Sequence, residues 1–186
     1  KQDILNLKFL QKIFKGVDYV FHEAALRSVE RSVNNPLETN KVNIEGTLNV
    51  LLASKDNKVK RVIFAGSSSS YGEQKVKVFK ESLCSKPLSP YALSKLTGEF
   101  YLKQFYQLYG LETITLRYFN VYGPYQDPAN EYANVIPIFI CKMLKDEEPA
   151  IHWDGEQSRD FNYIDDVVEA NILAIKAKKT QGEVLN

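Results

Sequence analysis

Short β-rich segments alternate with segments of helical periodicity through the first two thirds of this 186-residue chain. Strands that follow one another through a helical crossover lie parallel in the same sheet, and the crossover is right-handed. The alternation therefore predicts an α/β fold built on a doubly wound parallel sheet. The expected strands cover residues 17–25, 61–65 and 111–119, and the expected helices cover residues 5–15, 36–57 and 90–110.

The last of these helices has the clearest boundaries. Ser89 is followed by Pro90, the arrangement of an N-cap residue before a proline at the first helical position. Gly110 lies about twenty residues later and is a typical helix stop. We therefore expect one long helix between Ser89 and Gly110.

After Pro128 the alternation is less regular. We expect a helix over residues 134–145, a short strand around Ile151, a helix over residues 164–178 and a strand that begins at Val184. This predicts a larger sheet region, residues 1–128, and a smaller substrate lobe, residues 129–186. We expect the chain to be an internal segment of a longer protein, because no strand precedes the first helix and the chain stops within an apparent strand.

Composition excludes several classes of partner and site. The formal charge of +1 provides no broad basic surface for nucleic acid or an anionic membrane. No window reaches the roughly 18 apolar residues that a membrane span requires. Cys84 and Cys141 lie far apart without a Cys-x-x-Cys pair, which argues against a zinc site and a disulfide framework. We therefore expect no metal and a reducing, cytoplasmic setting.

Tyr91 and Lys95 form the first candidate for catalysis. They are four residues apart near the start of the long helix, so their side chains project from one helix face. A nearby ammonium and the positive helix end both favour the phenolate of a tyrosine, which could then take a proton from an alcohol. A tyrosine and a lysine at this spacing also occur on ordinary solvated helix faces.

A run of four serines supplies the second candidate. It follows the expected strand at 61–65, so it lies at the carboxyl end of that strand, where doubly wound sheets bind their ligands. Ser67 is nearest to the strand, and its hydroxyl could hold an alcohol or a carbonyl. Ser68 and Ser69 could equally face a ligand, whereas Ser70 could simply satisfy the turn backbone, the common use of serine in loops.

Three motifs in order carry a family resemblance: F-A-G-S-S-S-S-Y-G, S-P-Y-A-L-S-K and L-R-Y-F-N-V-Y-G-P. Together they closely resemble the extended short-chain dehydrogenase/reductase superfamily, over nearly the whole chain. The resemblance narrows to NAD-dependent UDP-hexose 4-epimerases, and it implies a Rossmann-like NAD-binding sheet. It also implies a catalytic triad, which maps to Ser67, Tyr91 and Lys95.

The same resemblance implies a set of cofactor contacts. Asp3 and Ile4 are similar to the Asp-Ile pair beside the adenine, and the strand end H-E-A-A-L resembles the loop that passes the pyrophosphate and the ribose. Asn43 matches a cofactor-side asparagine, and Tyr118 is similar to the residue against the nicotinamide. The implied NAD contacts are Asp3, Ile4, Ala24, Ala25, Leu26, Asn43, Tyr91, Lys95 and Tyr118.

On the substrate side, Asn120 and Arg159 resemble the residues that hold the UDP diphosphate, and a guanidinium fork suits phosphate oxygens. Arg159 could instead pair with Asp160 or Asp165. Asn134 and Val135 begin a helix whose backbone N–H groups suit an anion. The implied UDP-sugar contacts are Ser28, Ser68, Ser69, Asn120, Asn134, Val135, Ala150, His152 and Arg159. His22 is expected to be a core residue.

The resemblance implies epimerisation at C4 of UDP-N-acetylglucosamine, UDP-glucose or UDP-glucuronate through a 4-keto sugar, by a homodimer. A 4,6-dehydratase would usually carry Asp-Glu after the catalytic hydroxyl, where this chain has Ser68 and Ser69. A UDP-glucuronate decarboxylase and a noncatalytic binding module remain alternatives. The family's glycine-rich loop has no counterpart here, so we expect the isolated chain to bind NAD weakly.

Overall fold

The computed structural model describes residues 2–129, 135–151, 154–178 and 180–186. Helices and strands alternate along these residues. The helices are α1 (Leu7–Ile13), α2 (Val29–Asn34), α3 (Pro36–Asn40), a π-helical turn (Lys41–Glu45), α4 (Gly46–Asp56), a 3₁₀ turn (Ser68–Tyr71), α5 (Pro90–Tyr109), α6 (Val135–Met143) and α7 (Ile164–Lys176). The strands are β1 (Tyr19–His22), β2 (Arg61–Ser67), β3 (Glu112–Tyr118), β4 (Asn120–Tyr122), β5 (Phe161–Tyr163) and β6 (Gln181–Leu185).

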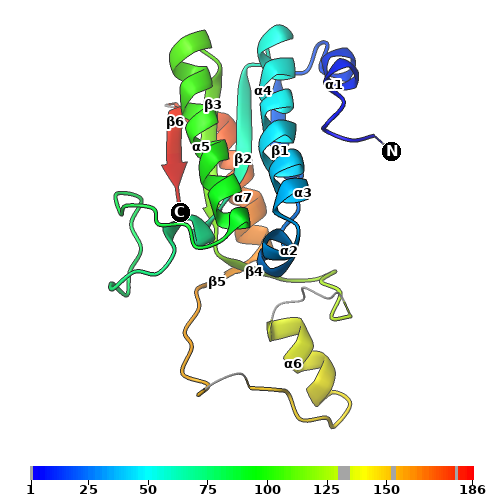
Figure 1. The fold of residues 1–186 in the computed structure, drawn as a ribbon, viewed down its shortest axis with the longest axis vertical. Coiled ribbons are helices and arrows are strands. Elements are labelled where there is room, and N and C mark those ends of the chain that lie inside the picture. Colours follow the sequence, from blue (N-terminus) through cyan, green and yellow to red (C-terminus); the bar gives the residue numbers. More distant parts are fainter. Residues whose placement is uncertain (1, 130–134, 152–153, 179) are drawn as a thin grey trace. The chain divides into compact units, whose positions relative to one another are not determined.

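Four strands form the main sheet, in the order β1-β2-β3-β6 (Figure 1). Every neighbouring pair is parallel, which confirms the α/β fold with a doubly wound parallel sheet. The register pairs Ser67 at the end of β2 with Tyr118 at the end of β3. Because the strands are parallel, their carboxyl ends lie along one edge of the sheet, and loops that follow them meet there.

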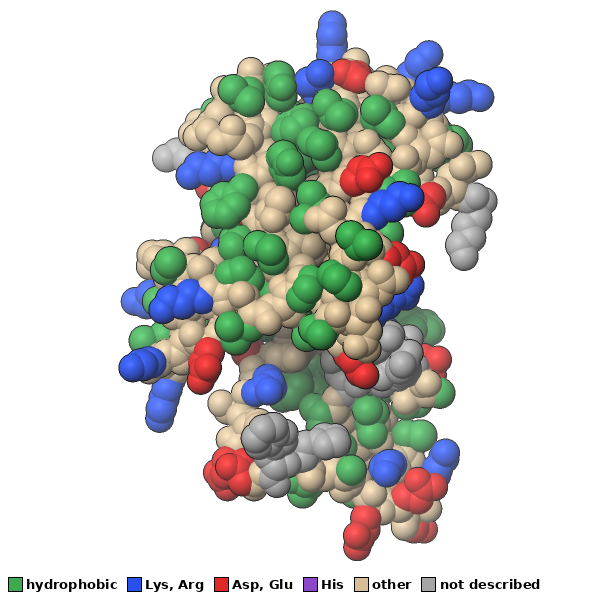
Figure 2. Space-filling model, in the orientation of Figure 1, with side chains coloured by type: hydrophobic (Ala, Val, Ile, Leu, Met, Phe, Trp, Pro, Cys, Tyr) green, Lys and Arg blue, Asp and Glu red, His purple; other side chains and the backbone are tan. Residues whose placement is uncertain are grey.

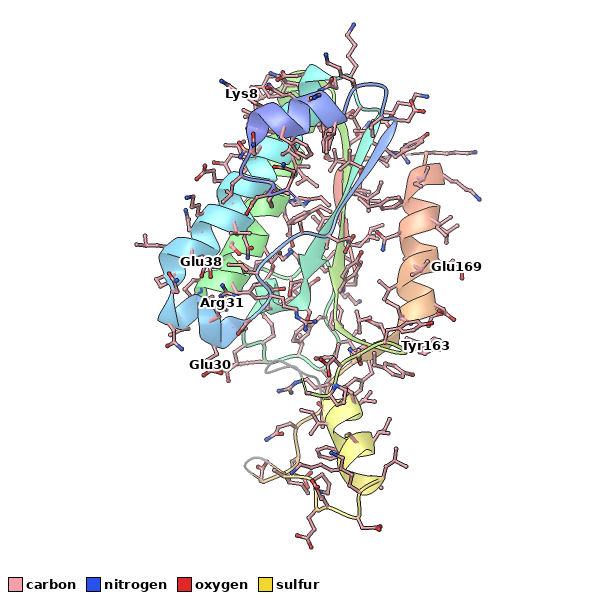
Figure 3. All side chains as sticks on the ribbon, turned by 90° about the vertical axis from the view of Figure 1, so that its right-hand side faces the viewer. Lys8, Glu30, Arg31, Glu38, Tyr163 and Glu169 are labelled. Atoms are coloured by element: carbon pink, nitrogen blue, oxygen red, sulfur yellow. The ribbon has the colours of Figure 1, made fainter. Side chains whose placement is uncertain are left out.

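Helices cover both faces of this sheet (Figure 3). On one face, α1, α4 and α5 share a core with β2, whose members include Leu51, Phe64 and Leu102. On the other face, Ala174 of α7 packs against Ile63 and Ile114. Burial on both faces explains why the sequence of β2 contains a continuous apolar run, since neither side of a central parallel strand contacts water.

The ends of α5 follow the sequence signals. The Ser89 hydroxyl accepts a hydrogen bond from the Ala92 N–H (3.1 Å), and Gly110 ends the helix with a left-handed φ of 70°. A Cβ atom on Gly98 would lie 2.6 Å from the Phe64 ring, so only glycine allows α5 to approach β2 this closely. This close approach brings Lys95, one turn earlier on α5, next to the end of β2.

The chain divides into two compact units, residues 1–118 with 170–186 and residues 119–169. This division differs from the boundary expected at residue 128. The physical reason is that β6 pairs with β3, which returns the end of the chain to the main sheet. The second unit contains α6 and a two-stranded parallel pairing of β4 with β5.

Other sequence expectations differ locally from the structure. Ile151 does not lie in a strand, and the strand of this region is β5, ten residues later. The sequence interpretation also missed α2, which Ser28 caps, and the short strand β4. These elements have three to six residues, too few to show a helical or alternating period.

An apolar stripe remains exposed on α5. Leu93, Phe100 and Leu108 are seven and eight residues apart, so they lie on one helix face, and they are 52%, 61% and 66% exposed. Hydrophobic side chains gather on the face of the molecule that carries α3, α4 and α5 (Figure 2). In the described part of the chain, no helix combines the length and the apolar character needed to cross a bilayer.

Candidate functional site

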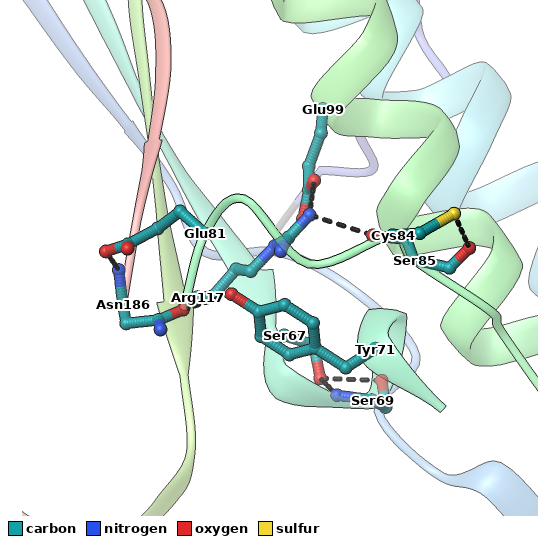
Figure 4. Close-up of polar contacts among 9 residues, drawn as sticks. All are labelled: Ser67, Ser69, Tyr71, Glu81, Cys84, Ser85, Glu99, Arg117 and Asn186. Carbon is teal, nitrogen blue, oxygen red and sulfur yellow. Dashed lines mark hydrogen bonds and ion pairs between the residues drawn. The ribbon is translucent and has the colours of Figure 1, made fainter. Parts of the chain in front are cut away.

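Ser67 and Tyr91 meet at the carboxyl edge of the sheet. Ser67 is the last residue of β2, and Tyr91 is the second residue of α5. The Ser67 hydroxyl acts on the Tyr91 hydroxyl and lowers its pKa. The Ser67 hydroxyl also contacts the Ser69 hydroxyl (2.7 Å) and accepts a hydrogen bond from the Ser69 N–H (3.2 Å; Figure 4). The 3₁₀ turn that follows β2 thus fixes Ser67 in place beneath the tyrosine.

Burial raises the pKa of Tyr91, while the hydrogen bond to Ser67 and the positive charge of Arg27 lower it. The net direction is upward, because desolvation penalises the phenolate. This differs from the expectation that Lys95 supplies the cation acting on Tyr91. The cation that acts on Tyr91 is Arg27, which follows β1 in the loop leading to α2.

Lys95 lies four residues after Tyr91 on α5 and is 4% exposed. Its ammonium donates a hydrogen bond to the Ala65 carbonyl (2.8 Å) and lies 5.0 Å from the centre of the Phe64 ring. Burial lowers the pKa of Lys95 to about 8, and the negative charges of Glu23 and Glu99 oppose this shift. An ammonium carries three donors. Among the described residues only one is used, so Lys95 has donors left for a ligand hydroxyl.

Asn43 connects the loop after β1 to α5. Its Oδ1 accepts a hydrogen bond from the Leu26 N–H (2.8 Å), and its Nδ2 donates to the Leu26 carbonyl (3.0 Å) and to the Ser94 hydroxyl (3.0 Å). Asn43 is 2% exposed. Its amide thus fixes the backbone at Leu26, the last residue of the Ala24–Ala25–Leu26 loop.

Tyr118 ends β3 beside Ser67 and contacts two polar side chains. Its hydroxyl donates to Glu23 Oε1 (3.1 Å) and accepts from Asn171 Nδ2 (2.7 Å). Burial, first of all, raises the pKa of Tyr118, and the neighbouring charge of Glu23 raises it further. Tyr118 therefore keeps its proton at neutral pH and acts as a hydrogen-bond donor.

A buried ion pair lies behind the serine turn (Figure 4). Arg117 donates from Nε and Nη2 to the two oxygens of Glu99 (2.9 and 2.6 Å), and both residues are at least 95% buried. The guanidinium also lies 4.4 Å from the centre of the Tyr71 ring. The ion pair thereby links β3, α5 and the turn that carries Ser67.

His22 is a core residue, as the sequence suggested. It is 3% exposed, and its Nε2 contacts the Thr47 hydroxyl (2.8 Å). Burial lowers the pKa of His22 to about 3, with a smaller contribution from the charge of Lys95. The ring is therefore uncharged at neutral pH.

Other expected ligand contacts lie outside this cluster, and some of them bond to the backbone of neighbouring residues. Asp3 Oδ1 accepts from the Leu5 N–H (2.9 Å), and Ile4 packs against Gly46 of α4. The Ser28 hydroxyl accepts from the Arg31 N–H (3.0 Å) and caps α2, and Ser28 is 6% exposed. Ser28 is thus a helix cap. Ser68 begins the 3₁₀ turn and is half-buried.

The second unit carries the expected UDP contacts. Asn120 Nδ2 donates to the Asp160 carbonyl (3.0 Å), and Arg159 Nη1 donates to the Ser158 carbonyl (2.8 Å). Within the described residues Arg159 forms no ion pair with an acid. Val135 begins α6, and Ala150 is exposed. Asn134 and His152 lie outside the described residues.

Three charged residues of the site escaped the sequence interpretation: Glu23, Glu99 and Arg117. The sequence positions of Glu99 and Arg117 could have predicted their role. Glu99 lies one helical turn after Lys95, and Arg117 lies in an otherwise apolar strand, so two opposite charges at core positions could have predicted a buried pair.

The comparisons with known proteins agree with this geometry. The family model described as "NAD dependent epimerase/dehydratase family" matches residues 1–186. The chain belongs to this family. Its fold is that of the family's solved structures: the UDP-N-acetylglucosamine 4-epimerase of Methanobrevibacter ruminantium, in complex with UDP-N-acetylmuramic acid, matches 99% of this chain and 58% of its own length, with 48% identity and a TM-score of 0.94.

Two further epimerase structures are also similar. The UDP-glucose 4-epimerase of Thermotoga maritima, with UDP-glucose, is 45% identical over 98% of this chain and 60% of its own, with a TM-score of 0.91. The UDP-glucuronic acid 4-epimerase of Bacillus cereus, with UDP-glucuronic acid and NAD, is 37% identical over 100% of this chain and 58% of its own, with a TM-score of 0.88. The chain spans 50% to 60% of the length of curated relatives that it matches.

Proposed function

We propose that the protein containing this chain is an isomerase that interconverts UDP-hexoses at C4 with NAD as cofactor. The observation that carries the proposal is that β2 brings together Ser67, which acts on the Tyr91 hydroxyl, and the buried ammonium of Lys95, which is bonded to Ala65 of the same strand, near the carboxyl edge of a parallel sheet. This edge is where doubly wound sheets bind their ligands. The similarity to 4-epimerases of three different UDP-sugars supports the same reaction.

The site residues fit NAD. Among the described residues the Lys95 ammonium uses one of its three donors, so the others are available to ribose hydroxyls. The Asn43 amide fixes Leu26, at the end of the Ala24–Ala25–Leu26 loop. Asp3, Ile4 and Tyr118 complete the proposed set of NAD contacts. Bound NAD would supply a reversible hydride acceptor for C4, so the epimerisation would be redox-neutral overall.

Tyr91 is the proposed proton-transfer group. Burial favours its protonated form, which can give a proton to a substrate oxygen. The hydrogen bond from Ser67 and the charge of Arg27 stabilise the phenolate, which can take the proton of the C4 hydroxyl. A reversible reaction needs both forms. Ser67 would also hold the C4 oxygen, with Ser68 and Ser69 beside it on the same turn.

The UDP portion is the proposed ligand of the second unit. The Arg159 guanidinium is exposed and, within the described residues, bonds to a neutral carbonyl, so its charge is available to a diphosphate. Asn120, Val135 and Ala150 are proposed to accompany it, together with Asn134 and His152. Ser28 is proposed to contact the sugar in addition to capping α2.

Product analysis tests the proposal. Purified protein is supplied with NAD and, in turn, UDP-glucose, UDP-N-acetylglucosamine and UDP-glucuronate, and the products are identified by NMR and mass spectrometry. We expect a C4 epimer of unchanged mass from at least one sugar. Loss of carbon dioxide would instead identify a decarboxylase, and loss of water a dehydratase. Binding of NAD and UDP without turnover would identify a noncatalytic binding module.

We further propose that the protein is a cytoplasmic homodimer. Cys84 and Cys141 both have free thiols, which suits a reducing compartment. The exposed apolar stripe on α5 can pack against the same stripe of a second copy, because a two-fold axis places one patch against itself. Burial of such a surface in a dimer would remove it from water.

Phe100→Glu should dissociate the dimer, because it places a charge at the centre of the proposed apolar contact. Size-exclusion chromatography with light scattering should show a dimer for the wild-type protein and a monomer for the variant. Leu144→Glu is the matched control, since Leu144 is 81% exposed and does not belong to the α5 stripe. A Phe100→Glu variant that stays dimeric would contradict this choice of interface.

A further inference from the structure

The loop of residues 72–86 leads from the 3₁₀ turn after β2 toward α5, and its two ends meet. The Lys86 N–H donates to the carbonyls of Ser70 and Tyr71 (3.1 and 3.2 Å). Gly72 has a left-handed φ of 63°, and a Cβ atom there would overlap the Lys86 carbonyl, so only glycine allows this approach. A surface loop whose ends are close and bonded in this way is an Ω-loop.

Asn186, the residue after β6, holds both the loop and the turn before it. Its backbone N–H donates to Glu81 Oε1 (3.0 Å; Figure 4), and its Nδ2 donates to the Phe79 carbonyl (2.9 Å). Its Oδ1 accepts a hydrogen bond from the Tyr71 hydroxyl (2.7 Å). A side-chain amide is at once a donor and an acceptor, so this one group can bind two segments.

The bond to Tyr71 connects Asn186 to Ser67 through a short series of contacts. Tyr71 is fully buried and is the last residue of the 3₁₀ turn. Across this turn the Gly72 N–H donates to the Ser69 carbonyl (3.1 Å). Ser69 in turn contacts the Ser67 hydroxyl with its own hydroxyl (2.7 Å) and donates to it from its N–H (3.2 Å). The end of β6 is thus linked to the hydroxyl at the end of β2.

Arg117 restrains the same loop and turn from β3. Its guanidinium lies 4.4 Å from the centre of the Tyr71 ring, and its Nη2 donates to the Ser85 hydroxyl (3.1 Å). The same guanidinium forms the buried ion pair with Glu99, so a substitution of Arg117 would disturb the core as well as the loop. Asn186 is exposed, which makes it the better position at which to release the loop.

From these contacts we infer that Asn186 is a positioning residue: it ties the 72–86 loop and the 3₁₀ turn to the end of β6, and through Tyr71 it fixes the Ser67 hydroxyl. The catalytic consequence rests on the proposed function, in which Ser67 holds the C4 oxygen. Asn186 acts through Tyr71 and transfers no proton itself.

Hydrogen exchange of the protein that contains this chain tests the tie without any ligand. Asn186→Leu keeps the size of the side chain and removes both of its hydrogen bonds. The amides of residues 72–86 should then exchange faster by a factor on the order of ten, and by a larger factor than the amides of β2. Unchanged exchange in the loop would overturn the inference.

Kinetics tests the route through Tyr71. Asn186→Leu should lower kcat for epimerisation about tenfold and leave KM for the UDP-sugar within about twofold, because a displaced reacting group costs more in the transition state than in binding. Tyr71→Phe keeps the ring and should lower kcat as well. The double variant should lose no more than the larger single loss. A loss equal to the product of the single losses would contradict the route through Tyr71. Should the double variant fail to fold, the exchange of the loop in Asn186→Leu decides.

Asn57→Leu is the matched control. Asn57 Nδ2 also donates to backbone carbonyls, those of Gln11 and Ala53 (3.1 and 2.9 Å), but it follows α4 and precedes β2, at the amino edge of the sheet. The substitution should lower stability and keep kcat within about twofold of wild type. An equal loss of kcat in Asn57→Leu and Asn186→Leu would reduce the effect to general destabilisation and overturn the inference.

The two measurements also separate this inference from the proposed function. Faster loop exchange in Asn186→Leu, in a protein without epimerase activity, would confirm the tie to β6 and remove the proposed function. Epimerase activity with the same kcat in the wild type and in Asn186→Leu would keep the proposed function and overturn the positioning role of Asn186.

Discussion

Tyr91→Phe should reduce the turnover number for C4 epimerisation by a factor on the order of 10² to 10⁴, the usual contribution of a positioned acid–base group. The substitution removes the hydroxyl that is hydrogen-bonded to Ser67 and leaves the ring on α5. Affinity for UDP should change little, because the proposed UDP contacts lie in other residues. Steady-state kinetics gives the turnover, and calorimetry with UDP gives the affinity.

Tyr106→Phe is the matched control for this experiment. Tyr106 lies on the same helix and is half-buried, so the same substitution there removes a hydroxyl without touching Ser67 or Lys95. Its turnover should stay within about twofold of wild type, as expected for a change outside the site. Near-normal turnover in Tyr91→Phe would remove Tyr91 from the mechanism, whatever the other residues of the site do.

The sheet could be predicted from the sequence because its signals are local. Ser89, Pro90 and Gly110 mark the ends of α5, and the Ser89 cap and the left-handed Gly110 are both present. The buried run of β2 and the alternation of elements then fixed the parallel topology. By contrast, the return of β6 to β3 depends on pairing across more than sixty residues, which local signals cannot report.

Part of the site was also predictable, because some of its residues are close together in the sequence. Tyr91 and Lys95 share one helix face, so their spacing predicts that they lie near each other. The contact between Tyr118 and Glu23 joins residues 95 positions apart, and that between Asn171 and Tyr118 joins residues 53 apart. Such contacts depend on strand order and on the placement of α7. The cation near Tyr91 was misassigned to Lys95 because helical spacing reveals neighbours on α5 and misses Arg27, on the loop after β1.

Glu99→Gln should lower the free energy of unfolding by about 3–5 kcal/mol, the usual effect of breaking a buried ion pair by removing one partner. The substitution leaves the Arg117 guanidinium 95% buried without a counter-charge. Arg117 cannot lose its proton to escape this penalty. Urea denaturation followed by circular dichroism measures the loss. The chain also offers a second Arg–Glu pair, in which Arg61 donates from Nε and Nη2 to one oxygen of Glu112, Oε2 (2.9 and 2.6 Å).

Glu112→Gln is therefore the matched control, and burial is what separates the two pairs. The Glu112 side chain is 47% exposed, whereas that of Glu99 is 4% exposed. Arg61 also donates to the Ala174 and Ile175 carbonyls, which remain after the substitution. Water and these carbonyls can satisfy Arg61, so Glu112→Gln should cost about 1 kcal/mol or less. Equal losses in the two variants would show that burial of the unpaired guanidinium does not set the energy of these contacts.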